Sequence, residues 1–195
     1  MNDSDNGAEW LELLKDATDQ ALDNCRYLFI NIQMLANNKA DVIDYLYNYK
    51  PRFCDVIIWD KILSAPAMAK KVLNAQFEFI FVLSKISNSR AIGTRDFRGT
   101  ITNIYEGMAQ RTNEYSDVHG ATFPIHLPSH FITSFTNDGG FVLDLFGGTG
   151  TTLIAAEQFN RTCYMMELDP RYCDIILDRW EKFTGENAEV INGER

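Results

Sequence analysis

The sequence predicts an α/β fold with a largely parallel sheet, and two observations support this prediction. Short runs rich in Val, Ile, Phe and Tyr are almost continuously apolar, which is typical of strands buried on both faces of a sheet. The segments between these runs place apolar residues at helical spacing. No Pro-, Gly- or Ser-rich linker interrupts the 195 residues, so we expect a single domain or part of one.

The first half of the chain is expected to alternate helices and strands. Residues 8–23 place Trp10, Leu14, Ala17 and Ala21 on one face, which predicts an amphipathic helix. Apolar runs predict strands, and the segments between them predict two further helices. In order, we expect a strand at 26–32, a helix at 40–49, a strand at 54–60, a helix at about 66–75, and a strand at 77–84.

The second half begins with residues 86–118, which are rich in glycine, arginine and polar side chains and are expected to be mostly loop. Two more strands and two helices should follow, at 141–146, 151–159, 163–168 and 170–183. The chain is therefore interpreted as one domain, 1–195. It divides into a first half (1–85), a basic loop region (86–118) and a second half (119–195).

The composition excludes several classes of protein. With 46% hydrophobic and 23% charged residues the chain can bury a core, which argues against disorder. No apolar run is long enough for a membrane helix, and the first residues do not have the pattern of a secretory signal. The four cysteines lack metal-ligand spacing, so we expect reduced thiols in the cytoplasm and no metal site.

The net charge of −9 is unevenly distributed. Residues 1–24 hold seven acids and one lysine, which we interpret as a solvated surface. Residues 85–111 have a net charge of +3. The arginines of this stretch are candidates for contacts with DNA phosphates, and scattered surface charge is the alternative: Arg90, Arg95, Arg98 and Arg111.

The stretch 141–167 contains the most informative pattern. An apolar strand ends in Asp144, a glycine-rich turn follows at 147–150, and a helix is expected from Thr151. Glycines let a ligand approach the backbone, and a helix start offers unpaired N–H groups. Glu167 lies 23 residues after Asp144, at the end of the next expected strand, where an acid accepts hydrogen bonds from ribose hydroxyls. The layout predicts a site for an adenosine-containing cofactor.

The details of the loop decide which cofactor is favoured. The dinucleotide motif G-x-G-x-x-G fails because Leu153 follows where its last glycine should stand. A P-loop needs a lysine where Thr151 stands. Asp144 would repel a pyrophosphate but favours an ammonium group, so S-adenosylmethionine is preferred. The alternative is an ordinary glycine-rich turn.

Three segments resemble motifs of the amino-group DNA methyltransferases, which methylate adenine N6 or cytosine N4. Residues 144–152 (DLFGGTGTT) are similar to the D-P-F-x-G-[ST]-G-T-T motif of that family. Residues 166–172 (MELDPRY) resemble its ribose-binding element, and 119–124 (HGATFP) its H-P-A-x-F-P element. Leu145 and Gly120 replace the usual prolines. The order of the motifs resembles that of the permuted branch of the family.

This resemblance implies an enzyme of site-specific DNA methylation, as in restriction-modification, with S-adenosylmethionine as cofactor and DNA as partner. It implies a Rossmann-like methyltransferase sheet. The residues that it assigns to the cofactor are Asp144, Phe146, Gly147, Gly148, Thr149, Gly150, Thr151, Thr152, Glu167, Leu168, His119, Ala121, Thr122 and Phe123.

The family's catalytic [DNS]-P-P-[YFW] motif has no counterpart, because the sequence contains no Pro-Pro pair. No catalytic residue is therefore assigned. We expect an incomplete sheet of about five strands, in which the strand that leads to the catalytic loop is missing. An upstream segment or a second chain would supply that loop. The target base and the recognition sequence are not determined by the residues present.

Two other functions remain open. The chain could be a non-catalytic cofactor- or DNA-binding subunit that supports a partner chain, or a methyltransferase that acts on RNA or a small molecule. If a strand is missing, segment 26–32 should pair directly with 141–146, accept a strand from another molecule, or leave the isolated chain poorly soluble.

Overall fold

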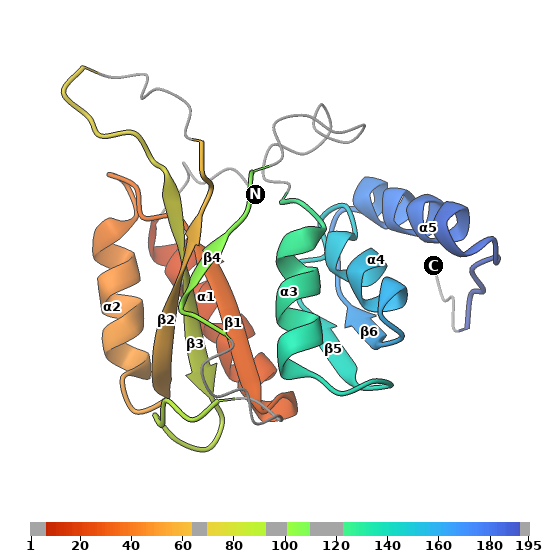
Figure 1. Cartoon of the computed structure of the whole chain (residues 1–195), viewed down its shortest axis with the longest axis horizontal. Helices are drawn as coiled ribbons and strands as arrows, with labels where there is room; N and C mark the ends of the chain where they lie inside the picture. The colour runs from red at the N-terminus through yellow and green to blue at the C-terminus, as the bar shows by residue number, and fades with distance from the viewer. Residues whose placement is uncertain (1–6, 64–69, 93–100, 110–122, 192–195) are drawn as a thin grey trace. The chain divides into compact units, whose positions relative to one another are not determined.

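The computed structural model describes residues 7–63, 70–92, 101–109 and 123–191, and it contains two compact units, residues 1–109 and 110–195 (Figure 1). The first unit begins with helix α1 (Gly7–Asn24), strand β1 (Tyr27–Ile32) and helix α2 (Lys39–Tyr49). Strands β2 (Phe53–Asp60), β3 (Phe77–Ser84) and β4 (Ile104–Glu106) follow. The α/β class expected from the sequence is confirmed.

The four strands of this unit form one mixed sheet in the order β1-β3-β2-β4. Strand β3 is antiparallel to both of its neighbours, pairing Phe81 with Ile30 of β1 and with Val56 of β2. Only the β2–β4 pair is parallel. The expectation of a largely parallel sheet is wrong for this unit, because a strand buried on both faces gives the same apolar run in either direction.

Helices α1 and α2 pack on one face of the sheet. Tyr45 and Tyr49 of α2 form a core with Leu22 of α1 and Leu83 of β3. Tyr45 is fully buried, and its hydroxyl lies 2.7 Å from Thr18 Oγ1 of α1. The Thr18 hydroxyl donates to the Leu14 carbonyl at 2.7 Å, so this buried network joins the two helices.

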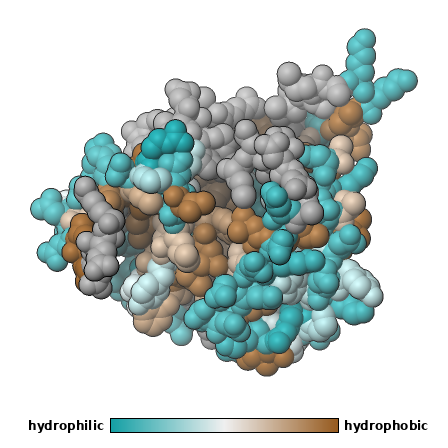
Figure 2. Space-filling model, turned by 180° about the vertical axis from the view of Figure 1, so that it is seen from behind, coloured by the Kyte–Doolittle hydropathy of each residue, from teal (hydrophilic) through white to brown (hydrophobic). Residues whose placement is uncertain are grey.

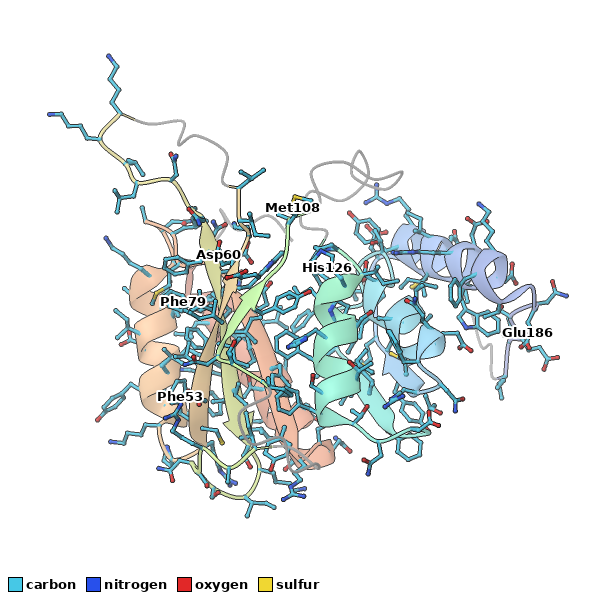
Figure 3. The ribbon with its side chains drawn as sticks, in the orientation of Figure 1. Phe53, Asp60, Phe79, Met108, His126 and Glu186 are labelled. Atoms are coloured by element: carbon cyan, nitrogen blue, oxygen red, sulfur yellow. The ribbon has the colours of Figure 1, made fainter. Side chains whose placement is uncertain are left out.

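The two ends of β2 are marked by Phe53 and Asp60 in Figure 3, and Met108 lies at the same end of the sheet as Asp60. Just before that end, the indole of Trp59 is buried and donates to the Gly107 carbonyl at 2.7 Å. Trp59 is therefore a core residue of this unit.

Two segments of the first unit differ from expectation. Residues 70–76 are not helical, so the helix expected at about 66–75 is wrong for the part that is described; residues 64–69 lie outside the described residues. The region 86–118, expected to be mostly loop, contains β4. This three-residue strand is formed by pairing with β2, a long-range contact that local composition does not encode.

The second unit contains α3 (His126–Phe135), β5 (Phe141–Asp144), α4 (Thr151–Gln158), β6 (Thr162–Met165) and α5 (Pro170–Thr184). Strands β5 and β6 are parallel, with Phe141 opposite Thr162 and Asp144 opposite Met165. Both strands end earlier than the sequence predicts. Apolar residues (Leu145, Phe146 and Met166) continue past the last paired residue into each turn, so apolar composition alone does not mark where the strand ends.

Helix α3 was not expected from the sequence. Its buried residues are Leu127, Phe131, Ile132 and Phe135. This spacing is compatible with one helical face, and Pro128 stands in the first turn, where proline is tolerated. The apolar spacing that predicts this helix was therefore present in the sequence. Ile132 packs against Ala155 and Ala156 of α4 and against Val142 of β5.

The described residues form six strands, one more than the five expected, and the additional strand is β4. Among these residues β1 pairs only with β3, and β5 pairs only with β6. The direct pairing of 26–32 with 141–146, one of the three outcomes expected for a missing strand, would join the two units and stays a prediction. One side of β1 and one side of β5 therefore have no strand partner in the described part of the chain.

On the face drawn in the space-filling view of Figure 2, hydrophilic and hydrophobic residues are interspersed. Within the described ranges there is no helix of the length and hydropathy that a membrane span requires. The same ranges hold no group of three His, Cys, Asp or Glu side chains placed to bind a metal ion. All four cysteines are free thiols.

Candidate functional site

The glycine-rich turn between β5 and α4 is a sharp, internally hydrogen-bonded loop. Gly148 and Gly150 both have positive φ, 53° and 78°. The Gly150 N–H donates to the Gly147 carbonyl at 2.8 Å, and α4 begins at the next residue, Thr151. The predicted strand, glycine turn and helix start are thus confirmed as local structure.

The turn also packs closely against its surroundings. A Cβ on Gly147 would lie 2.8 Å from the Met165 side chain and 3.1 Å from the Met166 carbonyl. A Cβ on Gly150 would lie 3.1 Å from Cγ1 of Ile176 in α5. Glycine is required here for close approach, and at Gly150 also for its left-handed backbone.

Glu167 connects the second strand to this turn. Its Oε2 accepts a hydrogen bond from the Gly148 N–H at 2.7 Å, and its Oε1 accepts from the N–H groups of Leu168 and Asp169 at 2.8 and 2.9 Å. From the sequence, Glu167 is expected at the end of the strand. Because β6 ends at Met165, Glu167 lies instead in the turn after the strand. The carboxylate and the glycine loop are nevertheless in direct contact.

Asp144 lies at the end of β5, and its Oδ1 accepts from the Phe146 N–H at 3.0 Å. Three apolar side chains of the same segments are exposed: Phe146 by 56%, Met166 by 62% and Leu168 by 95%. Exposed apolar side chains next to carboxylates are suited to contact a ligand that has both a planar apolar part and polar groups.

The start of α5 is fixed directly after Glu167. The Asp169 carboxylate caps the helix by accepting from the Arg171 N–H at 2.9 Å, with Pro170 at the first position. Its Oδ2 also lies 2.6 Å from Nη2 of Arg171. Hydrogen bonding lowers the pKa of Asp169 to about 2. The larger contribution comes from the Arg171 side chain and the smaller one from the backbone N–H of Arg171.

Cys163 lies in β6, opposite Val142 of β5. Its burial, together with the negative charge of Asp144, raises the pKa of this thiol to about 12. A thiol in that state is a poor nucleophile, because the thiolate is the reactive form. Burial also raises the pKa of the other three thiols, Cys25, Cys54 and Cys173.

Thr149 and Thr151 are buried within the loop, with 4% and 5% exposure. They meet a residue that the sequence reasoning missed, Arg179 of α5. Its Nη1 donates to the Thr149 carbonyl at 2.9 Å and lies 3.2 Å from Thr151 Oγ1. No local motif marks Arg179, since it lies far along the chain from the loop; only the packing of α5 brings it there.

The remaining predicted site residues fall into two groups. Phe123 is half-buried just before α3, and Thr152 is half-buried in the first turn of α4. Arg90 is exposed and pairs with Asp55, with 2.8 Å between Nη2 and Oδ2. Six residues lie outside the described ranges: His119, Ala121, Thr122, Arg95, Arg98 and Arg111.

Comparison with known proteins gives a family match over most of the chain. The model of the N6/N4 methyltransferase family, described as DNA methylase, matches residues 1–178. The type II methyltransferase M.Cfr9I of Citrobacter freundii is 30% identical over 145 residues, covering 69% of this chain and 45% of that protein. M.XycI of Xanthomonas campestris pv. cyanopsidis is 29% identical over 139 residues with the same coverage. The chain thus spans less than half the length of these relatives.

Solved structures show the same fold. The PvuII DNA methyltransferase (cytosine-N4-specific) superposes with a TM-score of 0.69 at 18% identity, covering 92% of this chain and 76% of that chain. The M1.HpyAVI–SAM complex superposes with a TM-score of 0.68 at 19% identity, covering 90% of this chain and 84% of that chain.

Proposed function

The chain belongs to the DNA methylase family of N6/N4 methyltransferases, and from this premise we propose that it is the S-adenosylmethionine-binding part of a DNA amino-methyltransferase. The proposed reaction transfers a methyl group to adenine N6 or cytosine N4. The M1.HpyAVI structure, similar in fold, is a complex with SAM, and the PvuII enzyme is named as cytosine-N4-specific. These names support the cofactor and the reaction class for this chain.

One observation supports the proposal most strongly: the 2.7 Å hydrogen bond from the Gly148 N–H to Glu167 Oε2. It places the glycine loop and the acid of the next strand at one site, which an ordinary glycine turn does not require. A carboxylate has about four acceptor sites, and Glu167 uses three of them on backbone N–H groups. One acceptor site of Glu167 therefore remains for a ribose hydroxyl.

The charge of the site favours a cofactor without phosphates. Asp144 and Glu167 are both acids beside the loop, and they oppose a pyrophosphate while favouring an ammonium group. The exposed side chains of Phe146, Met166 and Leu168 offer an apolar surface to an adenine ring. When bound, S-adenosylmethionine supplies an electrophilic methyl group on its sulfonium; the protein contributes position and electrostatics.

We assign no catalytic residue to this chain and propose that another segment or a second chain supplies the loop that holds the target base. Among the described residues β1, β4, β5 and β6 are edge strands, so the strand pairing leaves room for an additional strand. Open edges of this kind are suited to accept an additional strand. A cofactor-binding subunit that supports a partner chain is the second candidate, favoured by the same absence of a Pro-Pro motif from the sequence.

DNA is the proposed substrate, and the cytoplasm, where thiols stay reduced, is the proposed compartment. Four arginines remain proposed phosphate contacts: Arg90, Arg95, Arg98 and Arg111. Arg90 should contribute less to phosphate binding than the other three arginines, because its charge is already compensated by the ion pair with Asp55. If the other three act together, each charge removed should lower the salt dependence of DNA binding by about one unit.

The test has two arms. Calorimetry of the purified chain should show binding of S-adenosylmethionine and no binding of NAD or ATP; the reverse preference would contradict the cofactor assignment. A labelled-methyl assay on unmethylated DNA should show no turnover by the chain alone and turnover after addition of the partner segment. Turnover by the chain alone would show that it contains a catalytic element that the sequence reasoning missed.

A further inference from the structure

Helix α5 contacts both halves of the proposed cofactor site with one face. Cys173, Ile176 and Arg179 follow one another at intervals of three residues, which places them on the same side of a helix. The Cys173 thiol lies 3.7 Å from the Glu167 carbonyl, and Ile176 packs under Gly150. Arg179 reaches Thr149 and Thr151. One rigid element therefore fixes the loop relative to the acid.

Arg179 acts on one particular peptide group, the one between Thr149 and Gly150. In a trans peptide the C=O and N–H point in opposite directions. The Thr149 carbonyl accepts from Arg179 Nη1 at 2.9 Å, and the Gly150 N–H donates to the Gly147 carbonyl at 2.8 Å. The peptide plane is thus held at both ends. Gly150 on one side of this plane has a positive φ, as does Gly148 one residue before Thr149, and glycine restricts the backbone less than any other residue. The contact with Arg179 therefore restrains a segment in which the backbone itself has unusual freedom.

The burial of the contact makes it difficult to replace. Thr149 and Thr151 are almost completely buried, so water does not readily substitute for the guanidinium. A charged donor also forms stronger hydrogen bonds than a neutral one. The same guanidinium restrains the last residues of the loop and the first residue of α4, where the helix N–H groups begin.

We propose that Arg179 is a positioning residue that pre-organises the glycine loop for cofactor binding. The proposal deepens the proposed function and rests on it. Arg179 does not itself contact the cofactor. It fixes the loop in the conformation in which the Gly148 N–H faces Glu167, so that the cofactor does not have to order the loop when it binds.

The experiment compares Arg179→Met and Arg179→Lys with a control on the same helix, Trp180→Phe. The Trp180 indole donates to Glu157 Oε2 at 3.0 Å, so its loss weakens the contact of α5 with α4 without touching the loop. Thermal unfolding identifies conditions in which all variants are folded. Under these conditions calorimetry measures S-adenosylmethionine affinity, and hydrogen exchange measures protection of the amides at 147–152 in the ligand-free chain.

Arg179→Met should weaken the affinity by about tenfold or more and should raise amide exchange in the loop. Arg179→Lys should fall between it and the wild type, because lysine keeps one charged donor. Trp180→Phe should lower thermal stability while affinity and loop exchange stay at the wild-type level. Unchanged affinity in Arg179→Met, or an equal loss in Trp180→Phe, would overturn the proposal.

The proposed cofactor binding and the positioning role of Arg179 are tested by separate measurements. If the wild-type chain does not bind S-adenosylmethionine, the proposed function is contradicted. The exchange measurement, which needs no cofactor, still decides the positioning role: unchanged loop exchange in Arg179→Met would overturn it.

Discussion

The Gly148 N–H donates to Glu167 Oε2 over 2.7 Å, although the two residues are 19 positions apart. This bond joins the turn after β5 to the turn after β6, and β5 and β6 are paired as parallel neighbours. The carboxyl ends of adjacent parallel strands meet at one edge of a sheet, which is where α/β proteins bind ligands. The proposed site follows from that geometry.

Glu167→Ala should abolish most cofactor binding. It removes the acceptor proposed for the ribose and the anchor of the Gly148 N–H, so we expect a loss of affinity of about hundredfold, from two charge-assisted hydrogen bonds. Calorimetry with S-adenosylmethionine measures it. Glu157→Gln is the control, because Glu157 is an exposed acid of α4 that bonds only to the Trp180 indole among the contacts described above. Equal affinity in Glu167→Ala and wild type would remove Glu167 from the site.

Gly150→Ala should destabilise the chain more than Gly185→Ala. The two glycines have nearly the same φ, 78° and 77°, so the left-handed backbone costs about 1–2 kcal/mol at each. A Cβ on Gly185 meets nothing within 4 Å, whereas on Gly150 it meets Ile176 at 3.1 Å. Denaturant unfolding measures the free energy of unfolding of both variants, and the difference between them is the cost of packing the Cβ against Ile176. Only Gly150→Ala should also weaken S-adenosylmethionine binding; equal behaviour would contradict the close packing of the loop on α5.

The titration of Asp169 should have its midpoint at about pH 2 in the folded chain. Because this pKa is depressed from 3.8, the stability that the carboxylate contributes is present above the unfolded-state value and is lost as pH falls through the folded-state value. Arg171→Gln should raise the midpoint toward 3.8, while the backbone N–H of residue 171 keeps it below that value. Carbon-detected NMR of the Asp169 carboxyl measures the titration midpoint in the wild type and in Arg171→Gln. An unchanged midpoint in Arg171→Gln would contradict the assigned cause.

Cys163 should react very slowly with iodoacetamide in the folded chain. With a pKa of about 12, only about one thiol in ten thousand is ionised at pH 8. Mass spectrometry of the alkylated peptide measures the rate, and the same peptide in denaturant provides the reference. Because burial is the main cause and Asp144 the lesser one, Asp144→Asn should accelerate the reaction only slightly. Equal rates in folded and denatured chain would contradict the burial of this thiol.

Thr18→Val should destabilise the first unit by about 1–3 kcal/mol, because it leaves the buried Tyr45 hydroxyl without the acceptor that lies 2.7 Å away. Thr18→Ser is the matched control, since it keeps the hydroxyl and loses only a methyl group. Burial also raises the pKa of the Tyr45 hydroxyl, in agreement with a site that water does not reach. Denaturant unfolding measures the difference. A larger loss in Thr18→Ser than in Thr18→Val would show that packing, not the hydrogen bond, dominates.

Local chemistry made much of the second unit predictable from the sequence. The turn at 147–150 could be predicted because Gly148 and Gly150 adopt a backbone that other residues rarely adopt, and such positions appear directly as glycine in the sequence. The start of α5 could be predicted from neighbouring residues in the same way, because Asp169 and Pro170 are typical of a helix start.

In the first unit, the α/β class could be predicted from the apolar runs at 26–32, 54–60 and 77–84.

Other features were decided only by tertiary structure. Strand direction was one, since β3 is antiparallel to β1 and β2 although its sequence has the same apolar character as theirs. Strand β4 was another, because its three residues are a strand only by pairing with β2. The compensation of Arg90 by Asp55 likewise depends on two residues that are 35 positions apart.

The glycine loop, the two acids beside it and the motif pattern of the family could all be inferred from the amino-acid sequence, because they depend on residue type and short spacing. The hydrogen bond from the Gly148 N–H to Glu167 and the one from Arg179 to the Thr149 carbonyl became visible only in the folded structure. The physical reason is that hydrogen bonds between distant segments depend on how whole helices and strands pack. That packing is a sum of many weak contacts, none of which is visible at any single position of the sequence.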